Sequence, residues 1–171
     1  MNYTIALICG YGFAVIVGHL CVTTVVDRLW RCQAGNPSDA KAHSGAYLSR
    51  LVGCVERALF VATLQMGRGE LIGVWLVLKV AGQWKRWTEG EKVGDKVIDG
   101  RSSFNLFLIG SGLSIAYSFV GAQLIRFILG KDWWYAIGLP VGLLLATLLL
   151  HNQAKAYQSQ KKNDSGNQGA G

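Results

Sequence analysis

The sequence predicts an all-α protein, a polytopic transmembrane helical bundle with about five membrane segments. Three observations lead to this prediction. Half of the chain is hydrophobic (51% of 171 residues), and the apolar residues gather in long blocks without charge. The basic residues are concentrated in every second link between the predicted segments. Such blocks fit neither a soluble domain nor a disordered chain.

Three blocks are long enough to form membrane helices on their own. Residues 4–26, 106–125 and 133–150 hold no Asp, Glu, Lys or Arg over 23, 20 and 18 residues. A helix rises 1.5 Å per residue, so about 20 residues cross a hydrocarbon core of roughly 30 Å. The first block follows an uncharged N-terminus and is too long for a signal peptide, so we expect it to be retained.

Between the first two blocks, two further segments fold back on each other around the turn at residues 67–70. Neither contains proline. The second arm is short, and it spans only if a basic and aromatic cluster forms its interfacial end, with the tryptophans at headgroup depth. This cluster is Trp84, Lys85, Arg86 and Trp87.

We therefore expect five membrane segments in one domain, residues 1–151. A hairpin that dips into the membrane and returns is the alternative to the second and third segments. The remaining residues, 152–171, are rich in Gln, Lys, Ser, Gly and Asn, which predicts a disordered tail. The expected segments are residues 4–26, 47–66, 70–87, 104–129 and 133–151.

Basic residues favour one side of this arrangement. Twelve lie in or beside the first loop, the third loop and the tail, whereas the other two links hold three, Arg68, Arg126 and Lys131. By the positive-inside rule, the N-terminus is outside and the C-terminus is cytoplasmic. We expect the inner (plasma) membrane of a bacterium. The twelve are Arg28, Arg31, Lys41, Arg50, Lys85, Arg86, Lys92, Lys96, Arg101, Lys155, Lys161 and Lys162.

The hairpin arms carry charges at membrane depth. Arg57 is 11 residues before Arg68 in the turn and Lys79 is 11 after it, roughly 16 Å from the turn along a helix. We predict that Glu56 pairs with Lys79, or that Glu56, Arg57 and Lys79 form one network with a polar group such as His19. An unpaired charge there costs several kcal/mol. The network either sets helix register or forms a site for an ion, a proton or an anionic headgroup.

Small residues repeat at four-residue spacing in three segments, which predicts close helix packing in the membrane. Each set lies along one side of a helix, because four residues turn an α-helix by about 400°. We expect contacts within the chain or between copies. The residues are Gly10, Ala14 and Gly18, then Gly110, Ser114 and Ser118, then Gly138 and Gly142.

Catalytic and metal-binding patterns are absent from the sequence. The four cysteines, Cys9, Cys21, Cys32 and Cys54, have no C-x-x-C spacing, and three of them sit inside apolar blocks, so we expect burial. Cys32, just beyond the first block, could instead accept a palmitoyl group. We find no Ser-His-Asp or Cys-His arrangement, no paired carboxylates and no zinc motif. We therefore expect no enzyme activity, cofactor or metal. We also expect no nucleic-acid partner, because the basic residues behind the net charge of +7 lie mostly in the loops on one side of the membrane.

Two functions remain. The first is a non-enzymatic interaction or assembly subunit in the lipid bilayer, which binds another membrane protein or forms a homo-oligomer. The second is a small transporter-like or channel-like protein with Glu56, Arg57 and Lys79 at its polar centre.

Overall fold

The computed structural model describes residues 3–34, 46–89, 91–93, 96–98, 100–130 and 132–168. It confirms the all-α prediction, since helices form this part of the chain apart from one hairpin of two short strands. The elements in order are α1 (Tyr3–Gly12), the π turn η1 (Phe13–Val17), α2 (Gly18–Ala34), α4 (Ala46–Gln65), α5 (Glu70–Glu89), β1 (Glu91–Val93), β2 (Lys96–Ile98), α6 (Gly100–Gly130) and α7 (Trp133–Gln168).

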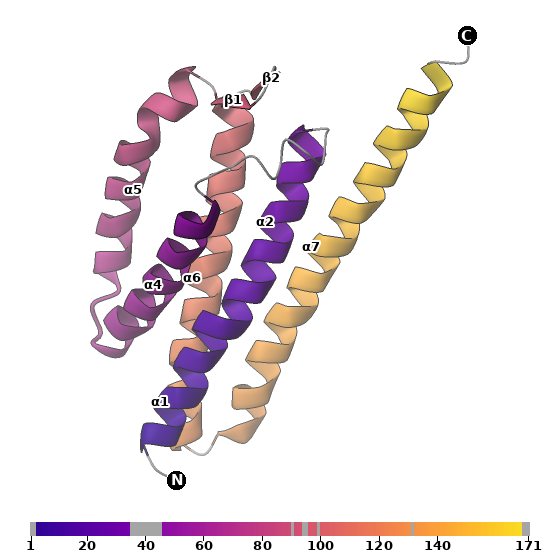
Figure 1. The fold of residues 1–171 in the computed structure, drawn as a ribbon. Coiled ribbons are helices and arrows are strands. Elements are labelled where there is room, and N and C mark those ends of the chain that lie inside the picture. The colour runs from indigo at the N-terminus through magenta and orange to yellow at the C-terminus, as the bar shows by residue number, and fades with distance from the viewer. Residues whose placement is uncertain are drawn as a thin grey trace.

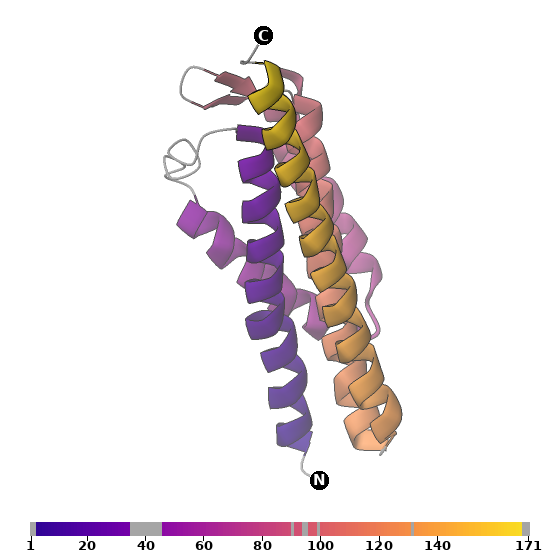
Figure 2. The same cartoon turned by 90° about the vertical axis from the view of Figure 1, so that its right-hand side faces the viewer.

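Three long helices run side by side and form the main body of the bundle. The continuous helix α1–η1–α2, α6 and α7 lie along one another, with the two termini at opposite ends (Figures 1 and 2). Each contains a stretch long and apolar enough to cross a membrane, which places the protein in a membrane. The stretches are Tyr3–Arg31, Gly100–Gly130 and Trp134–Gln153.

Helices α4 and α5 form a hairpin against this body, with α4 oblique to the long helices (Figures 1 and 2). The turn between them ends α4 by a Schellman motif. The Gly67 N–H donates to the Leu64 carbonyl at 3.2 Å, and the Arg68 N–H donates to the Thr63 carbonyl at 2.9 Å. Gly67 adopts the left-handed conformation that this motif requires, with φ of 71°.

Helix α6 is the central element, because it contacts every other helix. Its tightest contact is with α1, where two glycines let the backbones meet. A Cβ placed on Gly121 would lie 2.6 Å from the Gly10 carbonyl oxygen and 2.9 Å from the Ala14 Cβ. Gly121 was not among the residues that the sequence spacing indicated.

The π turn keeps the small residues of the first helix on one face. Residues four apart drift by about 40° per step in a regular α-helix. A π turn has more residues per turn and winds the helix back, and here the Gly18 N–H reaches the Phe13 carbonyl. Ala6, Gly10, Ala14 and Gly18 are consequently all buried.

The helices extend beyond the predicted apolar segments at several ends. Helix α7 continues to Gln168, whereas composition predicted a disordered tail from residue 152; residues 169–171 lie outside the described part. Gln, Lys and Ala are good helix formers, and extending an existing helix needs no new nucleation. In the link between α5 and α6, β1 pairs with β2 in an antiparallel hairpin.

The close contact of α6 with α1 predicts that replacing two glycines of α6 by alanine has different effects on stability. Gly121→Ala should lower stability by about 1–3 kcal/mol, because the added methyl group overlaps the α1 backbone. Gly112→Ala is the control, since its Cβ meets nothing within 4 Å and alanine favours a helix. Thermal unfolding in detergent measures both. Equal melting temperatures would contradict the close contact.

Candidate functional site: a charged centre inside the bundle

Glu56 and Arg57 occupy adjacent positions of α4 and are nearly inaccessible, at 3% and 2% exposed. Neighbouring residues point about 100° apart on a helix, so the two side chains reach different helices. Arg57 contacts His19 and Ser114, which lie inside the charge-free blocks 4–26 and 106–125, seven and eleven residues before the last residue of each block. The centre therefore lies within the apolar length of these helices.

The structure brings Glu56 and Lys79 together. The Lys79 Nζ lies 2.8 Å from each carboxylate oxygen of Glu56. The Trp75 Nε1–H also donates to this carboxylate at 3.1 Å, and the Lys79 ammonium lies 5.2 Å from the centre of the Phe107 ring. Trp75 precedes Lys79 by one helical turn, so both residues approach α4 from the same face of α5.

Arg57 points the other way, into the space between α2 and α6. Its guanidinium donates to the Ser114 Oγ at 3.1 Å, to the His19 Nδ1 at 3.2 Å and to the Cys54 Sγ at 3.6 Å. Within the described residues, Arg57 has no ion pair and its Nε has no hydrogen-bond partner. The two charges of α4 thus have separate sets of contacts.

Small residues make room for the Arg57 side chain. A Cβ on Gly18 would lie 3.1 Å from the Arg57 Cδ and 3.0 Å from the Tyr117 Cβ. Ser118 is buried beside them, with its Oγ 2.8 Å from the Ser114 carbonyl and 3.3 Å from the Arg57 carbonyl. The small residues of α2 and α6 therefore allow the helices to pack closely and leave space for the Arg57 side chain.

The structure corrects the expectation of no Cys-His arrangement. The Cys54 Sγ lies 3.3 Å from the His19 Nδ1, which also accepts from Arg57. A ring nitrogen that accepts hydrogen bonds carries no proton, so His19 is assigned as neutral with its proton on Nε2. Residues 19 and 54 lie on different helices, 35 positions apart, and sequence spacing contains no signal of such a pair.

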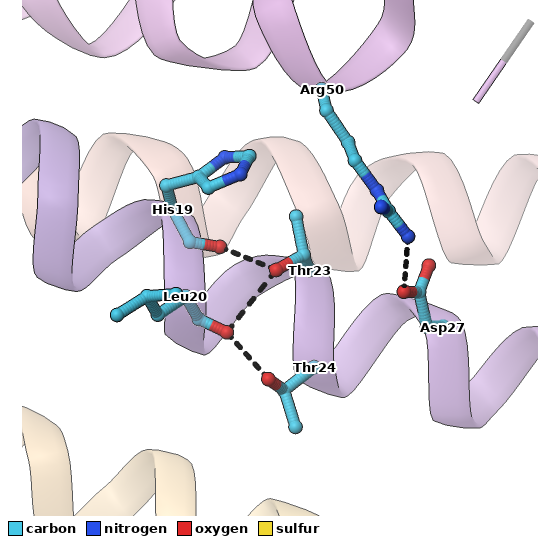
Figure 3. Close-up of polar contacts among 6 residues, drawn as sticks. All are labelled: His19, Leu20, Thr23, Thr24, Asp27 and Arg50. Carbon is cyan, nitrogen blue, oxygen red and sulfur yellow. Dashed lines mark hydrogen bonds and ion pairs between the residues drawn. The ribbon is translucent and has the colours of Figure 1, made fainter. Parts of the chain in front are cut away.

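Both ends of α4 are tied to charged residues. At one end, the Arg50 guanidinium donates to the Asp27 carboxylate at 2.8 Å, beside Thr23 and Thr24, whose hydroxyls donate to carbonyls of α2 (Figure 3). At the other end, Arg126 donates to the Leu64 carbonyl at 3.0 Å. Asp27 follows the first charge-free block, and Arg126 follows the second.

The long helices are also joined to one another by polar contacts. The Thr147 hydroxyl donates to the Leu143 carbonyl at 2.8 Å and therefore accepts from the Tyr117 hydroxyl, 2.9 Å away. Nearer the C-terminal end of α2, Arg28 contacts the ring of His151. These bonds attach α7 to α6 and α2.

The other predicted residues lie away from this centre. A Cβ on Gly110 would lie 3.3 Å from Val26, whereas Gly138 and Gly142 are exposed and have open space. In the interfacial cluster, Trp84 is 63% exposed and Lys85 is exposed, at the end of α5. The side chains of Arg86 and Trp87 lie outside those described.

Metal ligands do not gather here: the described residues contain no group of three or more His, Cys, Asp or Glu side chains that could hold a metal ion. Comparison with protein-family models, curated proteins and solved structures finds no match to this chain. Function therefore has to be argued from the site itself.

The ion pair of Glu56 with Lys79 predicts that the stability of the protein depends strongly on both residues. Lys79→Met should destabilise the protein by about 3 kcal/mol or more, because it leaves a carboxylate buried without its cation. The double variant Glu56→Gln with Lys79→Met should recover most of this loss. Thermal unfolding in detergent measures each.

The control for this comparison is Arg68→Met, which breaks the exposed pair of Arg68 with Glu70. Exposed pairs contribute up to about 1 kcal/mol. A Lys79→Met protein that is as stable as the parent would refute the pairing as a stabilising interaction.

Proposed function

We propose that this chain is a small integral membrane protein that acts as a non-enzymatic assembly subunit and associates with a second copy through α7. The observation that carries the proposal is the small-residue face of α7, formed by Gly138, Gly142 and Ala146. All three residues are exposed, and a Cβ on either glycine would meet nothing within 4 Å. Such faces drive helix association in lipid by allowing close backbone approach.

A second copy suits this face because a small-residue ridge is complementary to itself. Two identical ridges can cross about a two-fold axis, so that each fills the space beside the other. Helix α7 is also the outermost of the three spans, because only 11% of its most apolar stretch is buried, against 28% for the first helix and 44% for α6. Its free surface supports a role in association.

The closed state of the charged centre favours assembly over ion passage. A transport site has to open to water on at least one side. Glu56 and Arg57 are instead 3% and 2% exposed, and side chains of the same chain surround them. In this proposal the centre sets the register of α4 against its neighbours.

For the membrane topology, we propose five crossings with the N-terminus outside, in an inner membrane of bacterial type. The ties at the two ends of α4 support this. Arg50 bonds to Asp27 at one boundary, and Leu64 accepts from Arg126 at the other. The turn between α4 and α5 stops short of the N-terminal end of α1 (Figure 1). Arg126 bonds to the last turn of α4, and the long side chain of an arginine can reach the interface from such a position.

The proposed topology predicts where an introduced cysteine reacts. In a protein without native cysteines, Arg68→Cys should react with a membrane-impermeant maleimide added outside sealed cells, because residue 68 is exposed at the turn and five crossings put this turn on the outer side. Ala156→Cys is the control and should react only after the cells are opened. A cysteine at 68 that resists the reagent on the intact outer side would favour the dipping hairpin.

The proposed association predicts that a bulky residue on α7 separates the copies. Gly142→Ile should raise the dissociation constant of the dimer in vesicles roughly tenfold or more, equivalent to about 1.4 kcal/mol. Gly112→Ile is the matched control, because Gly112 is an exposed glycine of α6 outside the small-residue face. Energy transfer between labelled copies at falling protein-to-lipid ratio measures the constant.

A parent protein that is monomeric at every protein-to-lipid ratio would reject association through α7. Equal dissociation constants for the Gly142→Ile and Gly112→Ile proteins would reject the face. Thermal unfolding of both variants distinguishes a lost contact from a lost fold.

A further inference from the structure

Cys54 has the surroundings of a reactive thiol. Its Sγ lies 3.3 Å from the His19 Nδ1 and 3.6 Å from the Arg57 Nη2. A neutral imidazole nitrogen can take the thiol proton, and a guanidinium stabilises the negative sulfur that results. Three residues from two helices thus combine a nucleophile, a base and a positive charge.

Arg57 gives an independent reason to expect a negative charge at this place. It is 2% exposed, its Nε lacks a hydrogen-bond partner, and it has no ion pair in the part of the chain that the structure describes. An isolated buried cation is costly. Its described contacts, Ser114, His19 and Cys54, include no carboxylate, so a negative sulfur on Cys54 would lie directly against this charge.

Cys54 lies at the surface of the bundle, among exposed apolar side chains. His19 and Cys54 are partly exposed, and the neighbouring Leu20, Leu51 and Val55 are 60%, 50% and 52% exposed. The His19 ring lies on the side of α2 that faces the helix of Arg50 (Figure 3). His19 is seven residues inside the end of the first charge-free block, about 10 Å deep. Compounds that arrive there dissolve in hydrocarbon.

We infer that Cys54 is a nucleophilic modification site for apolar electrophiles dissolved in the bilayer, of the α,β-unsaturated carbonyl class. The thiol proton passes to the His19 Nδ1 as the sulfur bonds to the β-carbon and the carbon–carbon π bond opens. The enolate then takes a proton at its α-carbon from His19. The Arg57 Nη2 is within reach of both Nδ1 and Sγ, so it can turn from the ring to the sulfur during the addition.

The test labels the unaltered chain in lipid vesicles with N-ethylmaleimide, an apolar reagent of this class. Peptide mass spectrometry follows each cysteine with time. Cys54 should react at least about tenfold faster than Cys9 and Cys21, because general-base catalysis acts on Cys54. Cys9 is exposed and Cys21 is partly exposed like Cys54, so accessibility predicts the opposite order for Cys9.

A second measurement removes the base. His19→Gln keeps an acceptor for Arg57 but cannot take up a proton, so the rate at Cys54 should fall to that of Cys21 while the melting temperature stays near that of the parent. A Cys54 that reacts no faster than Cys9 in the unaltered chain would overturn the inference. So would a folded His19→Gln protein that retains the fast rate.

Discussion

The structure depends on the cost of placing charged groups in hydrocarbon. Each charge of α4 is covered by a different set of side chains, Glu56 by Lys79 and Trp75 of α5, and Arg57 by His19, Cys54 and Ser114. Leaving either group without these contacts would cost several kcal/mol. The contacts therefore connect the two arms of the hairpin with each other and with α2 and α6.

Close packing makes this coverage possible. Lipid supplies no hydrophobic drive for helix association, so contact depends on small residues that admit neighbouring atoms. Gly10 and Gly121 bring the backbones of α1 and α6 together, and Gly18 leaves space for the arginine stem. The π turn before Gly18 keeps these positions on one face. Packing and charge burial thus use the same residues.

The proposed reactivity of Cys54 is separate from the proposed role in assembly. A compound that reaches this site from the hydrocarbon of a bilayer would be apolar. The contacts of Cys54 with His19 and Arg57 would turn such a compound into a covalent mark on α4. Because Arg57 connects α4 to α2 and α6, a modified Cys54 would alter the contacts between these helices.

Sequence alone determined the fold class and the location of the charges. Charge-free length predicts spanning helices because a helix has a fixed rise and the hydrocarbon core a fixed thickness. Glu56 and Lys79 lie at nearly equal numbers of residues from the turn between the two arms, so the sequence predicted that they lie at the same depth.

Tertiary structure decided the rest. Sequence spacing could not reveal that His19 and Cys54 meet, that Arg57 lacks a carboxylate partner within the described residues, or that Gly121 is a contact while Gly138 is not. Those facts depend on how helices rotate about their own axes, which small residues and one π turn decide, and a count along the chain does not contain that rotation.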